Sequence, residues 1–253
     1  MSASGFLSPP AGPPSLENPG SDKQAFVART LLRQADRAAL ATIHARLAHP
    51  YVSLVGIATD IDGSPILLLS RLAEHTRAIL KNPQVSLLID GTKGFTNPQQ
   101  GPRLTLLGRV EPAPAERVAR RFLSRHPGAS LYAGFGDFAF YRMELERAHW
   151  IGGFGSAHWF VPAPACSPAA ADEIEAGMVD FLARANDLPD AAFDRLAGRP
   201  RKGRAQGWRL VDADPDGIDL AAKNRKGKVS RRSFLEPVGN LAEIERALFG
   251  QAN

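Results

Sequence analysis

Four side chains that could bind an anion lie within seven consecutive residues of the sequence. Ser70 and Thr76 contribute hydroxyl groups, Arg71 a guanidinium group and His75 an imidazole. The apolar run PILLLS ends at Ser70, and an amphipathic segment of about three turns follows it. A helix start exposes unpaired N–H groups and the positive end of the helix dipole, so this corner would favour an anion. The alternative is that Ser70 only caps the helix.

The segments around this corner predict a structure made mainly of strands. Apolar or alternating runs indicate the strands, and the turn DIDG indicates a hairpin between 51–59 and 65–70. The predicted strands are 39–43, 51–59, 65–70, 84–90, 103–111 and 138–147, the last continuing to 160 through the glycine-rich bend GGFG. Helices are predicted from Asp22, after Ser70, and over 114–126. This pattern favours an α+β fold with a small closed barrel of six or seven strands.

Helical spacing also predicts which side chains of the first two helices are buried. The predicted buried face is Phe26, Thr30, Leu31 and Ala35 in the first helix, and Leu72, Thr76, Ile79 and Leu80 in the second.

Composition divides the chain into four regions. Residues 1–21, rich in Pro, Ser and Gly, predict a disordered segment; 22–160 form the barrel domain; the Pro/Ala stretch 161–170 predicts a linker; and 171–253 predict a small α+β domain. In the last region, helices are expected at 172–185, near 193–196 and at 241–248, with strands at 208–211, 217–222 and near 228–234.

The overall composition is that of a cytoplasmic globular protein. Hydrophobic residues make up 44% of the 253 residues, which is ample for a packed core. No apolar run approaches the roughly 20 residues of a membrane helix, and the N-terminus has no signal-peptide pattern. Cys166 is the single cysteine, so an internal disulfide is excluded. We expect no membrane partner.

Positive charge is concentrated near the C-terminus. Between Arg199 and Arg232 the chain has eleven Lys or Arg and four Asp, although the net charge of the whole chain is only +5. Such a run is most often a solvated face. The other interpretation is a non-catalytic dimeric scaffold whose basic domain binds an acidic partner; nucleic acid is the less favoured partner.

Common catalytic motifs are absent from the sequence. It contains no GxxxxGK[ST], GxGxxG after a strand, HExxH, GxSxG or paired cysteines. A barrel with a basic, hydroxyl-rich corner is better suited to hold a cofactor than to perform acid–base chemistry unaided. His149 and His158 lie on either side of GGFG, beside Trp150 and Trp159, where a planar ligand could stack or be ligated.

Two stretches carry a family resemblance. PILLLSRLAEHTRAILKNPQVSLLID and GDFAFYRMELERAHWIGGFGSAHWF resemble the pyridoxamine 5'-phosphate oxidase-like split barrels, in the HugZ-type heme-utilisation branch with a small C-terminal α+β domain. The most specific signals are S-x-L-x-x-H-T, from Ser70 to Thr76, and GGFG, from Gly152 to Gly155. The resemblance implies a homodimer of six-stranded barrels with cofactor sites at the dimer interface.

For a flavin-binding member, the resemblance implies that the FMN phosphate lies at the strand end before the helix. Carried over residue by residue, the cofactor-binding set is Thr59, Ser70, Arg71, Leu72 (through its backbone), His75 and Thr76, with Trp150 and Phe154 shaped to contact the ring. The predicted function is therefore an FMN-binding oxidoreductase of unknown substrate, with no catalytic residue or metal ligand assigned.

Heme is the alternative cofactor. HugZ-type heme oxygenases ligate iron through a histidine near the C-terminus, whereas this chain has none beyond His158. His149 or His158 would have to substitute. The alternative function is therefore a heme-binding or heme-degrading protein of the same fold.

Overall fold

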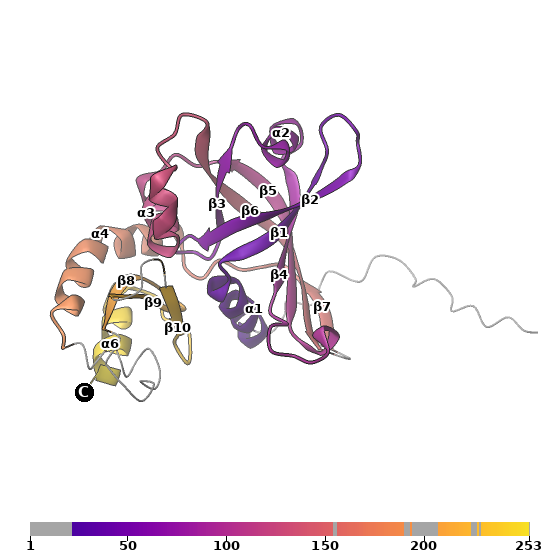
Figure 1. The fold of residues 1–253 in the computed structure, drawn as a ribbon. Coiled ribbons are helices and arrows are strands. Elements are labelled where there is room, and N and C mark those ends of the chain that lie inside the picture. Colours follow the sequence, from indigo (N-terminus) through magenta and orange to yellow (C-terminus); the bar gives the residue numbers. More distant parts are fainter. Residues whose placement is uncertain are drawn as a thin grey trace, which may run out of the picture.

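The computed structural model describes residues 22–153, 156–189, 193, 207–223, 227 and 229–252. Phe154, the segment 1–21 and most of the predicted helix near 193–196 lie outside these residues. Figure 1 shows a barrel of long strands and, beside it, a smaller sheet with its own helices. In the described ranges, no helix combines the length and apolar character needed to cross a membrane.

Six antiparallel strands close into the barrel. The strands are β1 (Arg37–Ile43), β2 (Pro50–Thr59), β3 (Pro65–Ser70), β4 (Gln84–Asp90), β5 (Arg103–Pro112) and β6 (Phe138–Gly153). They pair in the order β3-β2-β1-β4-β5-β6, and pairing between β3 and β6 closes the circle. The predicted six-stranded split barrel of an α+β fold is thus confirmed.

The glycine-rich run turns the chain back on itself. The predicted continuous segment 138–160 is β6 followed by a seventh strand, β7 (Ser156–Phe160), which pairs antiparallel with the end of β6. Gly153 has a φ of +132°, a conformation that favours glycine. β7 therefore extends the sheet beyond the closed barrel.

Alternation along the strands builds the barrel core. In β1 every second residue is buried, and the same period holds in β4 and β5. Leu40, Leu87, Leu106 and Met143 lie inside, each at most 2% exposed. Three helices accompany the barrel: α1 (Asp22–Gln34), α2 (Glu74–Lys81) and α3 (Glu116–Arg125), with short 3-10 turns η1 (Pro98–Gln100) and η2 (Pro127–Leu131).

The faces predicted for the first two helices need correction. In α1 the fully buried residues are Ala28, Leu32 and Arg33, whereas the predicted Leu31 and Ala35 are half-buried against the barrel core. Arg33 is buried because it meets buried carboxylates, which the helical pattern could not reveal. In the second segment Thr76 and Ile79 are buried as predicted, but Leu72 and Leu80 are 69% and 62% exposed. Leu72 lies outside the helix, since α2 begins only at Glu74.

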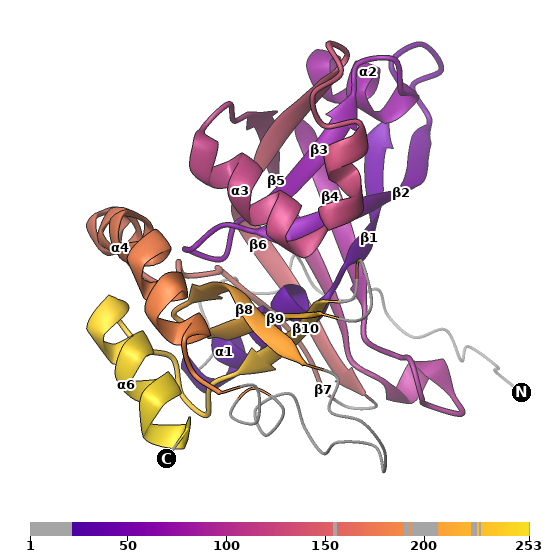
Figure 2. The ribbon, with the colours of Figure 1, turned by 60° about the vertical axis from the view of Figure 1, so that its left-hand side comes forward.

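The C-terminal region forms a second layer beside the barrel. Its elements are α4 (Pro168–Asn186), β8 (Trp208–Asp214), β9 (Gly217–Ala222), β10 (Val229–Ser233) and α6 (Leu241–Ala252). In Figure 2, α4 and α6 lie on the outer side of this sheet, away from the barrel. α4 begins within the predicted linker 161–170, because the Ser167 hydroxyl accepts the Ala170 N–H and caps the helix. The division into domains remains a prediction.

Buried ion pairs join the barrel to the small sheet. Asp214 of β8 accepts hydrogen bonds from Arg33 of α1, Arg121 of α3 and Arg231 of β10, at 2.8–2.9 Å. Asp216 lies in the turn after β8 and pairs with Arg33 at 2.6 Å. Charges this deeply buried are tolerated only when each is paired. The network therefore fixes the position of the small sheet against the barrel.

Candidate functional site

The hydroxyl group of Ser70 is already engaged. Ser70 Oγ donates a hydrogen bond to Asp137 Oδ2 at 2.5 Å and accepts one from the Leu72 N–H at 3.1 Å. Asp137 directly precedes β6, and the pairing of Ser70 with Phe138 holds it there. The Leu72 backbone N–H, predicted to face a cofactor, is therefore directed at Ser70 instead.

Arg71 is bound to the same loop. Its backbone N–H donates to the Asp137 carbonyl oxygen at 2.7 Å, and its guanidinium group donates to the Gly136 carbonyl oxygen. The loop before β6 thus uses donors of both Ser70 and Arg71.

Ser70 is not the cap of α2. The N-cap is Ala73, whose side chain makes no capping hydrogen bond, and the three residues 71–73 form a turn between strand and helix. The hydroxyl of Ser70 instead stabilises that turn through the Leu72 N–H. Strand, helix and strand occur in the predicted order, but the corner between the first two is wider than the sequence pattern suggests.

His75 and Thr76 lie in the first turn of α2, against the barrel. His75 Nδ1 is 3.1 Å from Ser53 Oγ of β2, and burial lowers the pKa of His75, which favours the neutral imidazole. Thr76 is fully buried, and its hydroxyl has no hydrogen-bond partner among the described residues. In the described part of the chain, the Thr76 hydroxyl is therefore a buried polar atom that a ligand could bind.

These contacts do not fit a flavin phosphate at Ser70 and Arg71. The Asp137 carboxylate receives the Ser70 hydrogen bond that a phosphate would need, and a second anion there would be repelled by it. Thr59 does not join the corner, because it pairs with Pro65, at the other end of β3 from Ser70. Its hydroxyl accepts a hydrogen bond from Arg33 at 3.1 Å.

The side chains of Trp150 and His158 project from the face of the sheet that covers the core. Trp150 pairs with Leu104 of β5 and His158 of β7, and Leu104 is buried. Paired residues in adjacent strands project to the same face, so all three lie on the core side. Nε2 of His158 is buried without a hydrogen-bond partner in the described part of the chain.

The opposite, outward face carries a row of side chains from six neighbouring strands. Register pairs place them in the order Leu54, Ala39, Leu88, Thr105, His149 and Trp159. We call this set the outer row. Leu54 is 70% exposed and Leu88 41%, so much of the row is apolar and open. Large apolar patches on a protein surface commonly mark binding sites.

His149 is the metal-ligating residue type in the outer row. Its ring stacks on Trp159, with centroids 4.5 Å apart and an interplanar angle of 11°. Burial lowers the pKa of His149, and the positive charge of a protonated His158 would lower it further. The imidazole is therefore neutral at pH 7, which is the form that can bind a metal ion.

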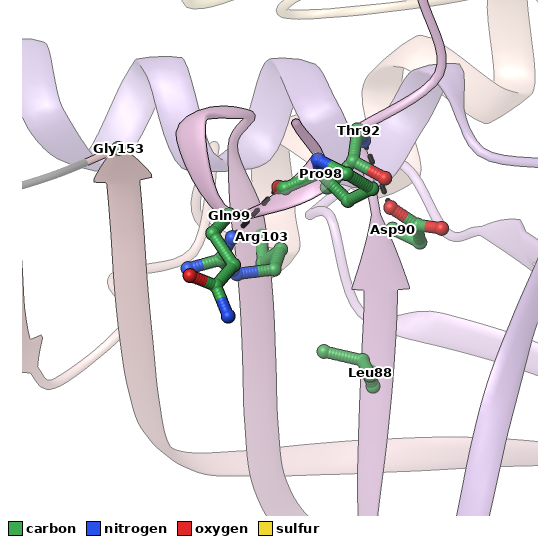
Figure 3. Close-up of a pocket in the computed structure, with 7 residues that line it drawn as sticks. All are labelled: Leu88, Asp90, Thr92, Pro98, Gln99, Arg103 and Gly153. Carbon is green, nitrogen blue, oxygen red and sulfur yellow. Dashed lines mark hydrogen bonds between the residues drawn. The ribbon is translucent and has the colours of Figure 1, made fainter. Parts of the chain in front are cut away.

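A hollow of about 600 Å³ lies beside the outer row (Figure 3). Its lining consists of Leu88, Asp90, Thr92, Pro98, Gln99, Arg103 and Gly153. Ligand pockets typically range from roughly 300 to 1,000 Å³, so the hollow is large enough for a cofactor-sized ligand. It lies at the Gly153 end of β6, whereas the Ser70 corner lies at the Phe138 end.

Opposite charges meet at the rim of this hollow. Arg103 pairs with Asp90 across β5 and β4, and its Nη1 donates to the Pro98 carbonyl oxygen at 2.9 Å. Hydrogen bonds from the Thr92 side chain and backbone lower the pKa of Asp90, with a smaller effect from Arg103. Arg103 is the one basic side chain among the described residues that line the hollow.

The sequence pattern did not reveal Arg103, Asp137 or Ser53 as site residues. Arg103 stands at the start of a predicted strand, and Asp137 stands before another. Their neighbours across the sheet depend on how the barrel closes, which no local pattern contains.

Comparison with known proteins agrees with the fold. The family model described as "CREG, beta-barrel" matches residues 19–165. The chain is 39% identical over 114 residues to the chloroplastic heme oxygenase HOZ of Arabidopsis thaliana. That match covers 43% of this chain, and the chain spans only about a third, 34%, of the plant protein.

Two solved structures resemble nearly the whole chain. One is the protein Atu2129, of unknown function, from Agrobacterium tumefaciens: it is 28% identical, with a TM-score of 0.72, and the match covers 96% of this chain and all of that one. The other is a heme-binding protein from Mycobacterium smegmatis, 25% identical with a TM-score of 0.51. This second match covers 90% of this chain and 95% of that one.

Proposed function

Because this chain belongs to the CREG β-barrel family, we propose that it uses the barrel's outward face to bind heme, with His149 as the iron ligand. The observation that carries the proposal is the His149 imidazole, stacked on Trp159 in the outer row beside a hollow of about 600 Å³. Heme is a flat apolar ring with an iron atom and two carboxylates. It therefore needs an apolar surface, an imidazole and a cation.

Arg103 would supply the cation. It lies diagonally across from His149, because Arg103 pairs with Ile151 and Thr105 with His149. A propionate in the hollow could form a charge-assisted hydrogen bond with its guanidinium group. Bound heme supplies the iron that ligates small molecules and exchanges electrons; the residues of the chain hold it in place and shield one face from water.

A second copy of the chain would cover the outward face. Ile43, Val52, Leu54 and Leu88 all point away from the core and are 41–70% exposed. A monomer would leave these four side chains in water, whereas a homodimer would bury them and enclose the hollow. We therefore propose a homodimer with the cofactor site at its interface.

Two relatives support heme over other ligands. The plant protein is named a heme oxygenase, and the mycobacterial protein, alike over nearly the whole chain, is described as heme-binding. The similarity to the plant protein is confined to 114 residues, so heme degradation is a further proposal for this chain.

Hemin titration tests the proposal. We expect a Soret band with the wild-type chain and a shifted or lost band in His149→Ala. His158→Ala is the matched control: it removes a second imidazole from the same hairpin, but on the core side of the sheet. An unchanged spectrum in His149→Ala would refute ligation by His149. Heme degradation is tested separately: loss of the Soret band after ascorbate is added to the heme-loaded wild-type protein in air would support it.

FMN is the second candidate. The buried Thr76 hydroxyl without a described partner, one helix position from His75, favours it. The hydrogen bond from Ser70 to Asp137 opposes it. We place heme first, because Leu88 of the outer row and Arg103 line a hollow, whereas the Ser70 hydroxyl is already bound. Absence of flavin absorbance, and no uptake of added FMN, would exclude the second candidate.

The basic C-terminal run supports a third function only weakly. Asp212, Asp214, Asp216 and Asp219 within it are buried, as is Arg231. Seven of its eleven basic residues, between Arg199 and Lys228, lie outside the described residues. Binding of an acidic partner remains a prediction, which salt-dependent retention on DNA would test.

A further inference from the structure

We propose that Asp137 is a specificity-determining residue that keeps phosphate-bearing cofactors out of the corner at Ser70. Asp137 lies at the Phe138 end of β6, so this role does not depend on heme binding at the Gly153 end. Asp137 stands in the loop before β6, outside the segment from Ser70 to Thr76 that the sequence pattern singled out.

The first step is that the corner already binds an anion. The Asp137 carboxylate accepts the Ser70 hydroxyl at 2.5 Å, within the range of charge-assisted O–H···O⁻ hydrogen bonds. Two hydrogen bonds to backbone carbonyl oxygens fix the loop in this position: the Arg71 N–H donates to that of Asp137, and the Arg71 guanidinium group donates to that of Gly136. The Ser70 hydroxyl therefore serves the chain's own carboxylate, and the two Arg71 donors serve carbonyl oxygens of the same loop.

The second step is that this carboxylate cannot easily leave. Ser70 and Phe138 are register partners in the pair of strands that closes the barrel, so Asp137 is tethered one residue from that pairing. A ligand phosphate would have to compete with a carboxylate that is always present at high local concentration. It would also approach a negative charge within a few ångströms, which is strongly unfavourable.

Removing the negative charge of Asp137 should by itself reverse the exclusion of phosphate. Asp137→Asn has nearly the same shape, and its amide oxygen can still accept from Ser70, so the loop keeps its anchor. A neutral amide holds the Ser70 hydroxyl less strongly than a carboxylate does, so a phosphate could displace it and use that donor beside Arg71. Its affinity for FMN should rise by at least about tenfold.

Quenching of FMN fluorescence measures this affinity in the full chain. We expect little quenching with wild type, clear quenching with Asp137→Asn, and competition by inorganic phosphate in the variant. Ser70→Ala combined with Asp137→Asn should lose most of the gain. Asp180→Asn, which removes an exposed carboxylate of α4, is the matched charge control and should behave as wild type.

Two results would overturn the proposal. Equal FMN affinity in wild type and Asp137→Asn would show that the carboxylate does not exclude the phosphate. No FMN or phosphate binding by Asp137→Asn, with an unchanged melting temperature, would show that the corner is not an anion site even when uncharged.

Discussion

Arg33 and Asp214 form a buried salt bridge of 2.8 Å, although they stand 181 positions apart in the chain. The side chains are 1% and 0% exposed. Arg33 belongs to α1, the helix that precedes the first barrel strand, and Asp214 belongs to β8, the first strand of the small C-terminal sheet. The two layers are therefore held together by paired charges as well as by apolar packing, and the carboxylate serves three arginines at once.

Removing this carboxylate should destabilise the fold strongly. Asp214→Asn would leave Arg33, Arg121 and Arg231 buried with too little negative charge, and breaking a buried pair costs about 3–5 kcal/mol. We expect that loss in the free energy of unfolding, measured by urea denaturation. Glu245→Gln is the control, because Glu245 pairs with Arg184 at the surface, where the side chains are 30% and 55% exposed, and the substitution should change stability by less than about 1 kcal/mol. Equal effects of both substitutions would contradict the role of the network.

The same carboxylate should make stability depend on pH. Burial alone would raise the pKa of Asp214, but Arg231, Arg33 and Arg121 outweigh it, so the pKa lies below its usual range. A lowered pKa stabilises the fold above about pH 4, where the unfolded chain is also ionised, and this stabilisation is lost as the pH falls further. We expect acid unfolding of wild type to be steeper below pH 4 than that of Asp214→Asn. Comparing the two chains separates Asp214 from Asp219, whose pKa burial raises; parallel curves would contradict the prediction.

Much of the barrel could be predicted because its strands alternate between core and surface. The runs ending at Thr59, Ser70 and Asp90 end where the strands do, since their apolar pattern and turn residues are local. The burial of Arg33 in α1 could not be predicted. A helical pattern places Arg33 in solvent, and its carboxylate partners come from the far end of the chain.

The Ser70 corner was predicted only in part for the same reason. Local sequence identifies a strand end, a hydroxyl and a guanidinium group, all of which are present. It does not show that β3 meets β6, which brings Asp137 to Ser70. Similarly, a count along the basic run sets its four aspartates against its own basic residues, but they are buried against arginines of the barrel domain as well as of the run.

Heme binding should weaken in mild acid. Burial, and then the charge of a protonated His158, lower the pKa of His149 below its usual value near 6.5. Only the neutral imidazole can bind iron, so affinity should be constant from pH 8 to about 6.5 and fall as the pH drops below the lowered pKa. Hemin titrations between pH 5 and 8, followed at the Soret band, measure this. His149→Ala should show weak binding without that pH dependence; the same profile in both chains would assign the titration to another group.

The outward face should control the oligomeric state. Leu54 and Val52 project from β2 on the side away from the core, with 70% and 61% exposure, and a charge between two such surfaces would be desolvated without a partner. We expect Leu54→Asp to halve the mass measured by light scattering after size-exclusion chromatography. The control is Leu235→Asp, which alters a leucine that is 90% exposed beside the C-terminal sheet and should leave the mass unchanged. If the hollow is completed by the second copy, Leu54→Asp should also weaken hemin binding while the melting temperature stays close to that of wild type. A dimeric Leu54→Asp would place the contact between copies on another surface.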